Sequence, residues 1–210
     1  MFITFEGGEG SGKSTQIKLL GEWLRGRGQS VVETREPGGS IGANEIRQLL
    51  VLGEVDRWDA ISETLLLFAA RRDHVIRTIE PALKERLIVL CDRYQDSTIA
   101  YQGYGHKINT KVLKVLFEFA INGLNPTLTF LLDIPANEGI DRSIKRQSSE
   151  LRFESFDINF HERVRQGFLE LAMKNPNRII KIDGLQTIDN IHEIVKSVFI
   201  QKMQESTKPI

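Results

Sequence analysis

The sequence lacks the features that mark secreted and membrane proteins. Its 210 residues include a single cysteine, Cys91, so no disulfide can form within the chain, which suits a reducing compartment. No apolar run approaches the roughly 18 residues that a membrane span needs. The N-terminus shows no basic segment followed by an apolar one, the pattern of a signal peptide. We therefore expect a cytoplasmic protein with no membrane partner.

An excess of charge of one sign is also missing. Lys and Arg together number 28, as do Asp and Glu, so the formal net charge at neutral pH is zero. Domains that bind nucleic acid usually carry a basic patch, and we expect no nucleic-acid partner. The 4 histidines do not show the spacing of metal ligands, and no Ser/His/Asp or Cys/His arrangement is indicated. The chemistry must come from other residues.

Glycine, in contrast, is concentrated near the N-terminus. Residues 2–5 predict a short buried strand, and an amphipathic helix pattern begins after Lys13. Between them, Gly7-x-x-x-x-Gly12-Lys13-Ser14 is the pattern of a phosphate loop, in which successive backbone N–H groups point at an anion. In such loops the lysine reaches the β- and γ-phosphates of ATP and the serine hydroxyl binds Mg²⁺. The alternative is a glycine-rich turn before an ordinary helix. The expected ATP-binding residues are Gly7, Gly8, Glu9, Gly10, Ser11, Gly12, Lys13, Ser14 and Thr15.

Strand and helix patterns alternate along the rest of the chain. Further strands are expected at residues 30–34, 87–91, 127–133 and 178–183, and helices at 41–52, 62–80, 111–121, 137–145, 160–173 and 188–203. Pro81 is expected to interrupt or kink the helix over 62–80. This order predicts an α/β protein, a phosphate-loop fold of three layers (α/β/α) with a five-stranded parallel sheet covered by helices. We expect residues 1–210 to form one domain with a small lid at about residues 142–156.

Ligands of such sheets bind beyond the carboxyl ends of the strands. Asp92 follows the strand at 87–91, and together with Ser14 it is the expected Mg²⁺ site. Arg71 and Arg72 on the long helix, and Arg93 after Asp92, suit a second phosphorylated substrate, because guanidinium groups bind phosphate oxygens bidentately. Each of these arginines could instead be a solvated surface residue. A GTPase is disfavoured, because neither Asn-Lys-x-Asp nor a strand followed by Asp-x-x-Gly is present.

Longer stretches then carry a family resemblance. They are FEGGEGSGKSTQ at 5–16, TREPGGS at 34–40, ETLLLFAARRDHV at 63–75, VLCDRYQDSTIAYQG at 89–103, GLNPTLTFLLD at 123–133 and RFES with FHERVRQGFLELA within 152–172. With them the chain resembles bacterial thymidylate kinases over nearly its whole length. The resemblance implies transfer of the γ-phosphoryl group of ATP to dTMP, giving dTDP and ADP in dTTP synthesis, by a homodimer. Two alternatives stay open: a kinase for another small phosphorylated acceptor, and a non-catalytic nucleotide-binding regulator.

The resemblance also implies roles for single residues. Glu9 matches a carboxylate that contacts the sugar 3′-hydroxyl, and Tyr101 an aromatic that crowds the 2′ position. Phe68 matches the ring that stacks on thymine, and Arg72 the arginine that reaches the thymine edge. Arg93 matches the arginine that holds the acceptor phosphate. The dTMP-binding residues so implied are Glu9, Pro37, Arg47, Phe68, Arg72, Arg93, Ser97, Thr98, Tyr101 and Gln102.

Members of the family differ in where their catalytic arginine lies. Some carry a basic residue inside the phosphate loop, where this chain has Gly10, so the sequence resembles the type that supplies arginine from the lid. Arg142, Arg146 and Arg152 are the candidates. Many bacterial members have an aspartate before the last of these arginines, and this chain has Leu151 there. The expected catalytic residues are Lys13, Glu9, Arg93, Arg146 and Arg152.

Overall fold

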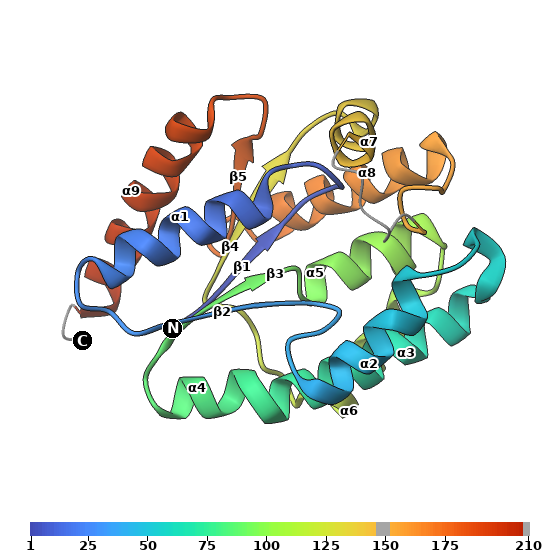
Figure 1. The fold of residues 1–210 in the computed structure, drawn as a ribbon, viewed down its shortest axis with the longest axis horizontal. Coiled ribbons are helices and arrows are strands. Elements are labelled where there is room, and N and C mark those ends of the chain that lie inside the picture. Colours follow the sequence, from blue (N-terminus) through green and yellow to red (C-terminus); the bar gives the residue numbers. More distant parts are fainter. Residues whose placement is uncertain (146–151, 208–210) are drawn as a thin grey trace.

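One parallel sheet organises the molecule (Figure 1). The computed structural model describes residues 1–145 and 152–207. The strands are β1 (Phe2–Glu6), β2 (Val31–Arg35), β3 (Ile88–Asp92), β4 (Leu128–Asp133) and β5 (Ile179–Asp183). They pair in the order β2-β3-β1-β4-β5, and every pair is parallel. The predicted five-stranded parallel sheet is confirmed.

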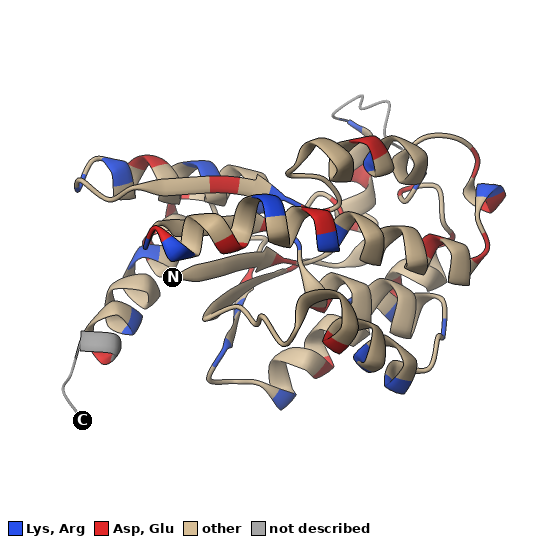
Figure 2. Cartoon of the chain, turned by 90° about the horizontal axis from the view of Figure 1, so that it is seen from below, with Lys and Arg blue, Asp and Glu red and all other residues tan. Residues whose placement is uncertain are grey.

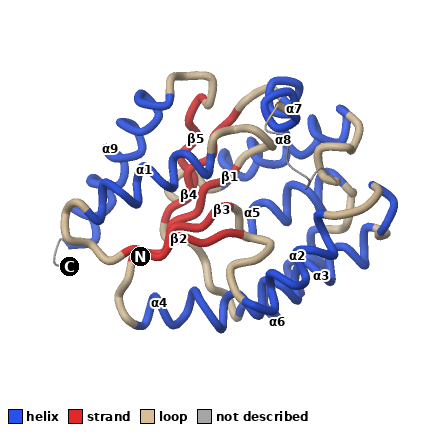
Figure 3. Tube along the Cα trace, viewed as in Figure 1, coloured by secondary structure: helices blue, strands red, loops and turns tan. Residues whose placement is uncertain are grey.

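Helices connect the strands and form the outer layers (Figure 3). The α-helices are α1 (Lys13–Arg25), α2 (Ile41–Val51), α3 (Ala60–His74), α4 (Glu80–Lys84), α5 (Gln95–Thr98), α6 (Thr110–Ile121), α7 (Ala136–Ile144), α8 (Ile158–Lys174) and α9 (Ile188–Thr207). A 3₁₀ turn, η1 (Val55–Arg57), and two π-helical turns, η2 (Val75–Ile79) and η3 (Ile99–Gly105), complete them. Within the described chain, none of these helices has the length and apolar character of a membrane span.

The two faces of the sheet bury alternate residues of each strand, as the period of two in a strand requires. On one face, Ile3 and Phe5 of β1 pack with residues of α1 and α9 in one buried cluster. On the other face, Phe2 packs with residues of α3, η2, α4 and α6. A third cluster joins Leu131 of β4 to α8 and η3. Both faces are therefore covered, which is why the central strands are apolar along almost their whole length.

Charged residues of both signs are mixed along the surface helices (Figure 2). Several pairs lie one helical turn apart, such as Lys18 with Glu22 on α1 and Lys174 with Glu170 on α8. These exposed pairs contribute little to stability, typically about 0.3–0.5 kcal/mol each. Their pattern agrees with the balanced charge of the sequence.

Pro81 does not act at the position that the sequence predicts. The regular helix α3 ends at His74, and the π-helical turn η2 carries the chain on to α4. Pro81 lies in the first turn of α4, where a residue without an N–H is well tolerated. The interruption predicted at the proline therefore occurs in the turn before it.

The segment after β3 folds in a way that the sequence patterns did not indicate. Residues 95–105 form α5 and the π-helical turn η3 without a break. Insertions of π-helical geometry are frequent at functional sites, because they rotate the following side chains out of the regular helical register. This segment carries Ser97, Thr98, Tyr101 and Gln102 to the edge of the sheet where the phosphate loop lies.

Candidate active site

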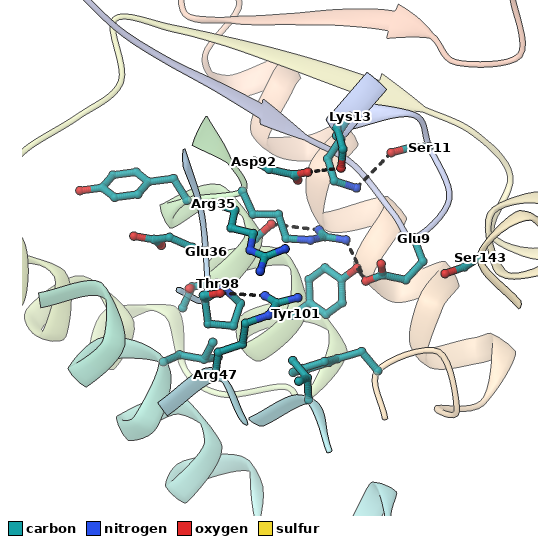
Figure 4. A pocket seen from close by; sticks show the side chains of 18 of the residues that line it. Glu9, Ser11, Lys13, Arg35, Glu36, Arg47, Asp92, Thr98, Tyr101 and Ser143 are labelled. Atoms are coloured by element: carbon teal, nitrogen blue, oxygen red, sulfur yellow. Dashed lines mark hydrogen bonds and ion pairs between the residues drawn. The ribbon is translucent and has the colours of Figure 1, made fainter. Parts of the chain in front are cut away.

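A pocket of about 310 Å³ lies beyond the carboxyl ends of β1, β2 and β3. Strand register explains its position, because Asp92 at the end of β3 is aligned with Phe5 of β1 and with Arg35 of β2. In the view of Figure 4, Lys13 and Asp92 lie at one end of the pocket and Arg47 at the other. Every predicted ATP-binding residue from Glu9 to Thr15 lines this pocket. So do Pro37, Arg47, Arg93, Ser97, Thr98, Tyr101 and Gln102.

The phosphate loop takes the strained backbone that its glycines allow. Gly7, Gly10 and Gly12 all have positive φ, and a Cβ on Gly7 would collide with the carbonyl oxygen of Leu132. The ammonium group of Lys13 is buried inside the loop and donates to the carbonyl of Gly8 at 2.8 Å. Burial and the charge of Arg93 lower the pKa of Lys13 to about 8, against the opposing carboxylates nearby. The loop thus holds a cation at its centre.

Ser14 and Asp92 meet at the mouth of the loop. The hydroxyl of Ser14 donates to Oδ2 of Asp92 at 2.5 Å, although the two residues are 78 positions apart in the chain. A hydroxyl and a carboxylate in contact are oxygen donors of the kind that Mg²⁺ prefers, since it binds through one or two protein oxygens and substrate phosphates. The residues present therefore fit the expected metal.

Arg93, Glu9 and Tyr101 form one hydrogen-bonded group at the centre of the pocket. Arg93 has φ 67°, a left-handed backbone, and its Nη2 donates to Oε1 of Glu9 at 2.8 Å. The hydroxyl of Tyr101 donates to the same oxygen at 2.7 Å. Burial would raise the pKa of Glu9, but Arg93, Lys13 and Tyr101 together lower it to about 2. Glu9 is therefore an ionised acceptor at neutral pH, and it holds both neighbours in place.

Arg71 is fixed by a second network at the other end. Its side chain is buried, and its Nε donates to Oε2 of Glu36 at 2.6 Å, while Nη1 donates to the hydroxyl of Thr98 at 2.9 Å. Nδ1 of His74, one helical turn further along α3, lies 3.0 Å from the other oxygen of Glu36. Burial would raise the pKa of Glu36, but Arg71 and His74 hold it below its ordinary value. Arg71 thus reaches the pocket with a fixed orientation.

The structure corrects two of the residues that the resemblance assigned to the base. Phe68 is buried among apolar residues and packs edge-on against Phe117 of α6, away from the pocket. Arg72 is exposed and donates from Nη1 to the carbonyl of Ala120. Leu67 and Arg71 line the pocket instead. Adjacent residues of a helix differ by about 100° in direction, so a shift of one position moves a side chain off the pocket face.

The structure also corrects the assignment of Arg152 as a catalytic arginine. Its side chain is completely buried and points away from the pocket, against α2 and α3. Nη1 donates to Oε2 of Glu63 at 2.6 Å, and the backbone carbonyls of Leu50, Glu54 and Val55 accept its other bonds. Every nitrogen of the guanidinium group is engaged there. Arg152 therefore anchors the segment that follows the expected lid.

The other two arginines of the expected lid are Arg142 and Arg146. Arg146 lies outside the described residues. Arg142, on α7, is exposed and donates to the carbonyl of Gly184 at 3.3 Å, and it does not line the pocket. Among the described residues of the expected lid, Ser143, Phe153 and Glu154 line the pocket. Burial and the charge of Glu9 raise the pKa of Glu154, which accepts a 2.7 Å hydrogen bond from Ser143.

Several pocket residues were not assigned a role from the sequence. Arg35 and Glu36 belong to the stretch TREPGGS, whose position after a strand was the available signal. Leu67 could have been found from its spacing of four residues from Arg71, which places both on one helix face; Arg71 itself was expected only as a phosphate contact. Phe153 and Glu154 directly follow Arg152 and gave no independent signal.

Comparisons with known proteins identify the family of the chain. A family model described as thymidylate kinase matches residues 5–195. The thymidylate kinase of Caulobacter vibrioides is 47% identical over 202 residues, covering 96% of this chain and 97% of the relative. That of Ruegeria pomeroyi is 46% identical over 206 residues, covering 98% and 97%. The crystal structure of thymidylate kinase from Ehrlichia chaffeensis has a TM-score of 0.77 and 38% sequence identity, and covers 95% of this chain and 98% of that chain. The chain belongs to the thymidylate kinase family.

Proposed function

We propose that the protein transfers the γ-phosphoryl group of ATP to dTMP, giving ADP and dTDP, in the cytoplasm. The observation that carries the proposal is a single pocket lined both by a phosphate loop and by a second group of arginines and aromatic residues. A nucleotide-binding regulator needs the first set but has no use for the second. The family membership supports the same reaction.

The donor end is the phosphate loop. The N–H groups of residues 9–15 bind the phosphates of ATP at the N-terminus of α1, and Lys13 reaches the β- and γ-phosphates. Ser14 and Asp92 would hold Mg²⁺, which supplies positive charge that neutralises the phosphate oxygens during transfer. Lys13 contributes most as charge develops on the transferring group, because it is buried and already oriented.

The acceptor end is the group around Glu9. Arg93 binds the phosphate of dTMP, and Arg47, whose Nη1 donates to the carbonyl of Pro37 at 2.7 Å, adds a second cation on that side of the pocket. Glu9 accepts a hydrogen bond from the sugar 3′-hydroxyl. Tyr101, held by Glu9, occupies the space that a ribose 2′-hydroxyl would need, which favours the deoxyribose.

The base of dTMP lies between Leu67 and the residues of α5 and η3. Leu67 offers an apolar surface to the ring, and Arg71 offers N–H donors to a thymine carbonyl. Thr98 and Gln102 complete this end. Arg71 and Leu67 replace Arg72 and Phe68 in the assignment, because they are the members of α3 that reach the pocket.

A lid over the pocket excludes water and so protects the γ-phosphate from hydrolysis. We propose residues 142–156 for it within a single domain, with Arg146 as the arginine that stabilises the transition state. Phe153 and Glu154 on the pocket wall support this position. The absence of a side chain at Gly10 gives the reaction a need for such a cation.

We also propose that the enzyme is a homodimer. Large apolar side chains are exposed on α3, on the turn η2 that follows it, and on α6, and the helices α3 and α6 pack on one another. These residues, the α3/α6 surface, are Ile61, Leu65, Ile76, Val112, Val115 and Phe119. Exposed apolar side chains on two helices that pack together suit a self-complementary, twofold interface.

A coupled assay of ADP release tests the function. The enzyme with ATP and Mg²⁺ is offered dTMP, UMP and CMP in turn, and we expect turnover with dTMP at a kcat/KM well above that for the other two. Turnover that does not depend on any of these acceptors would indicate a nucleotide-binding regulator. Preference for a different monophosphate would indicate a kinase for another acceptor.

A further inference from the structure

A buried carboxylate that takes no part in the proposed chemistry lies behind the base end of the pocket. Glu63 on α3 has no exposed side-chain surface. Its Oε2 accepts a hydrogen bond from Nη1 of Arg152 at 2.6 Å, and its Oε1 accepts one from Nε2 of Gln102 at 2.9 Å. Nε2 of His106 lies 3.2 Å from the same Oε1. Both oxygens of Glu63 therefore face donors.

The partners of Glu63 keep it ionised. Burial alone would raise the pKa of this carboxyl group, but the neighbouring His106 and Arg152 hold it below the ordinary value. An ionised carboxylate accepts hydrogen bonds and cannot donate them. Glu63 is therefore a fixed, buried acceptor, and an unmatched partner would be costly there.

This fixes which end of the Gln102 amide faces the pocket. A glutamine amide has a donor end, Nε2, and an acceptor end, Oε1, and it can turn by half a rotation at little cost when nothing holds it. Because Glu63 binds only a donor, Nε2 is turned toward it and away from the ligand. Gln102 is 1% exposed yet lines the pocket, so Oε1 is the group that it offers there.

The two pyrimidine bases differ at the atom that such an acceptor would meet. Thymine presents an N3–H donor between two carbonyl oxygens, whereas cytosine has a lone pair at N3 and an amino group at C4. We propose that Glu63 is a specificity-determining positioning residue, which orients the Gln102 amide so that Oε1 accepts from thymine N3–H and repels the N3 lone pair of cytosine. The inference rests on the proposed function, in which the base of dTMP lies at this end of the pocket.

Glu63→Gln tests the inference, because a glutamine at this site can donate as well as accept and lets the amide of Gln102 turn over. We expect the ratio of kcat/KM for dTMP to that for dCMP to fall about tenfold or more, since sites built on a hydrogen bond discriminate strongly. The ratio of kcat/KM for dTMP to that for dUMP should stay within about twofold of its value in the parent protein, because uracil has the same N3–H and lacks only the methyl group. A general loosening of the pocket would lower both ratios, and that result would overturn the inference.

Arg152→Lys is the matched control. Lysine keeps the positive charge beside Glu63 but loses the hydrogen bonds of the guanidinium group to the carbonyls of Leu50, Glu54 and Val55. The variant should therefore unfold at a lower temperature, while the ratio of kcat/KM for dTMP to that for dCMP stays unchanged. If its ratio falls as far as that of Glu63→Gln, discrimination follows stability and the inference is wrong.

Two further variants separate the inference from the proposed site. Gln102→Ala should raise the KM for dTMP and lower the ratio of kcat/KM for dTMP to that for dCMP. No change in this variant would mean that Gln102 does not touch the base, which overturns the inference together with that part of the proposed site. An effect in Gln102→Ala without one in Glu63→Gln overturns the inference alone.

If Glu63→Gln does not fold, the double variant that combines Glu63→Gln with Gln102→Glu tests the inference in its place. It should retain the preference for dTMP over dCMP, because an acceptor again faces the pocket. Loss of the preference in the double variant would contradict the inference.

Discussion

At the scale of single residues, the pocket depends on charged groups held out of water in fixed orientations. Arg71, Arg93 and Lys13 each contact at least one protein acceptor before any ligand binds. Those contacts fix the orientation of the cations, so their side chains lose less conformational entropy when the substrate binds. Variants of these residues are therefore expected to affect a specific binding step, and neighbouring residues of the same type serve as controls.

Arg71 and Arg72 form such a pair. Arg71→Ala removes a buried guanidinium at the base end of the pocket, and loss of a charge-assisted hydrogen bond of about 1.5–3 kcal/mol predicts a KM for dTMP raised at least about tenfold. Arg72→Ala removes an exposed side chain bonded to Ala120, and the KM should stay within about twofold. Steady-state kinetics with saturating ATP measures both. A larger effect in Arg72→Ala would restore the assignment made from the resemblance.

Glu6 gives a prediction about pH. Burial, together with the charge of Asp96, raises the pKa of Glu6 to about 7, above its value in the unfolded chain of about 4.3. Between these values the folded state holds a proton that the unfolded state has lost, so this contribution to stability is complete below about pH 4 and is lost as the pH rises through 7. Glu6→Gln is neutral at every pH. Its oxygen can still accept from the N–H of Tyr94, as the carboxylate does at 2.8 Å.

The free energy of unfolding of Glu6→Gln should therefore fall less than that of the parent protein between about pH 5 and about pH 8. Urea denaturation of both proteins across this range measures the difference, and all other titrating groups are common to the pair. Parallel curves would show that Glu6 has an ordinary pKa in the folded protein.

At the scale of whole elements, the sequence predicted most of the strands and helices but not the exact face that each presents. The alternation of apolar strands and amphipathic helices predicted five parallel strands but not their order in the sheet, and the glycine pattern lies in the loop between β1 and α1 as expected. The assignment of Phe68 and Arg72 was one residue out, because α3 is rich in apolar residues on several sides and its periodicity does not identify the face toward the pocket. Helical register is fixed by packing, in this case against α2 and α6.

Elements without a strong local pattern were missed for a related reason. The π-helical turns η2 and η3 have no sequence signature of their own, and they arise where packing and hydrogen bonding outweigh the regular helical repeat. The position of Arg152 was equally inaccessible, since its partners Glu63, Leu50 and Glu54 are about one hundred positions away in the chain. Long-range partners of this kind cannot be read from local periodicity.

Arg152 has a predicted effect on stability. Arg152→Ala removes the buried partner of Oε2 of Glu63 and of three backbone carbonyls, and breaking such a pair typically costs about 3–5 kcal/mol in the free energy of unfolding. Urea denaturation measures the loss. Arg142→Ala is the control, because its exposed side chain makes one 3.3 Å bond to Gly184 and its removal should cost no more than about 0.5 kcal/mol. A slower phosphoryl transfer in Arg152→Ala with unchanged stability would instead favour the catalytic role.

At the scale of the whole molecule, the parallel sheet brings the site residues together at the carboxyl ends of its strands. Residues from β1, β2 and β3 that are far apart in the sequence reach the pocket because the carboxyl ends of these strands are adjacent. The packed pair of helices α3 and α6 borders the pocket on one side and carries exposed apolar residues on another. Arg71 of α3 faces the pocket, while exposed apolar residues of both helices form the α3/α6 surface. An interface on this surface would therefore lie directly behind the helix that binds the base.

Phe119 is the residue with which to test that interface. It is 87% exposed on α6, and Val115 on the same helix is 69% exposed. In a twofold interface Phe119→Glu introduces one carboxylate from each copy, either opposite the other or against apolar side chains. Burying these two charges is costly, so the dimer should dissociate. Met173→Glu is the control, because Met173 on α8 is 70% exposed and lies outside the α3/α6 surface. Sedimentation equilibrium should give a dimer for the parent protein and the control, and a monomer for Phe119→Glu. A dimer that persists in Phe119→Glu would mean that the copies meet through another face, and a monomeric parent protein would mean that the site functions without a partner.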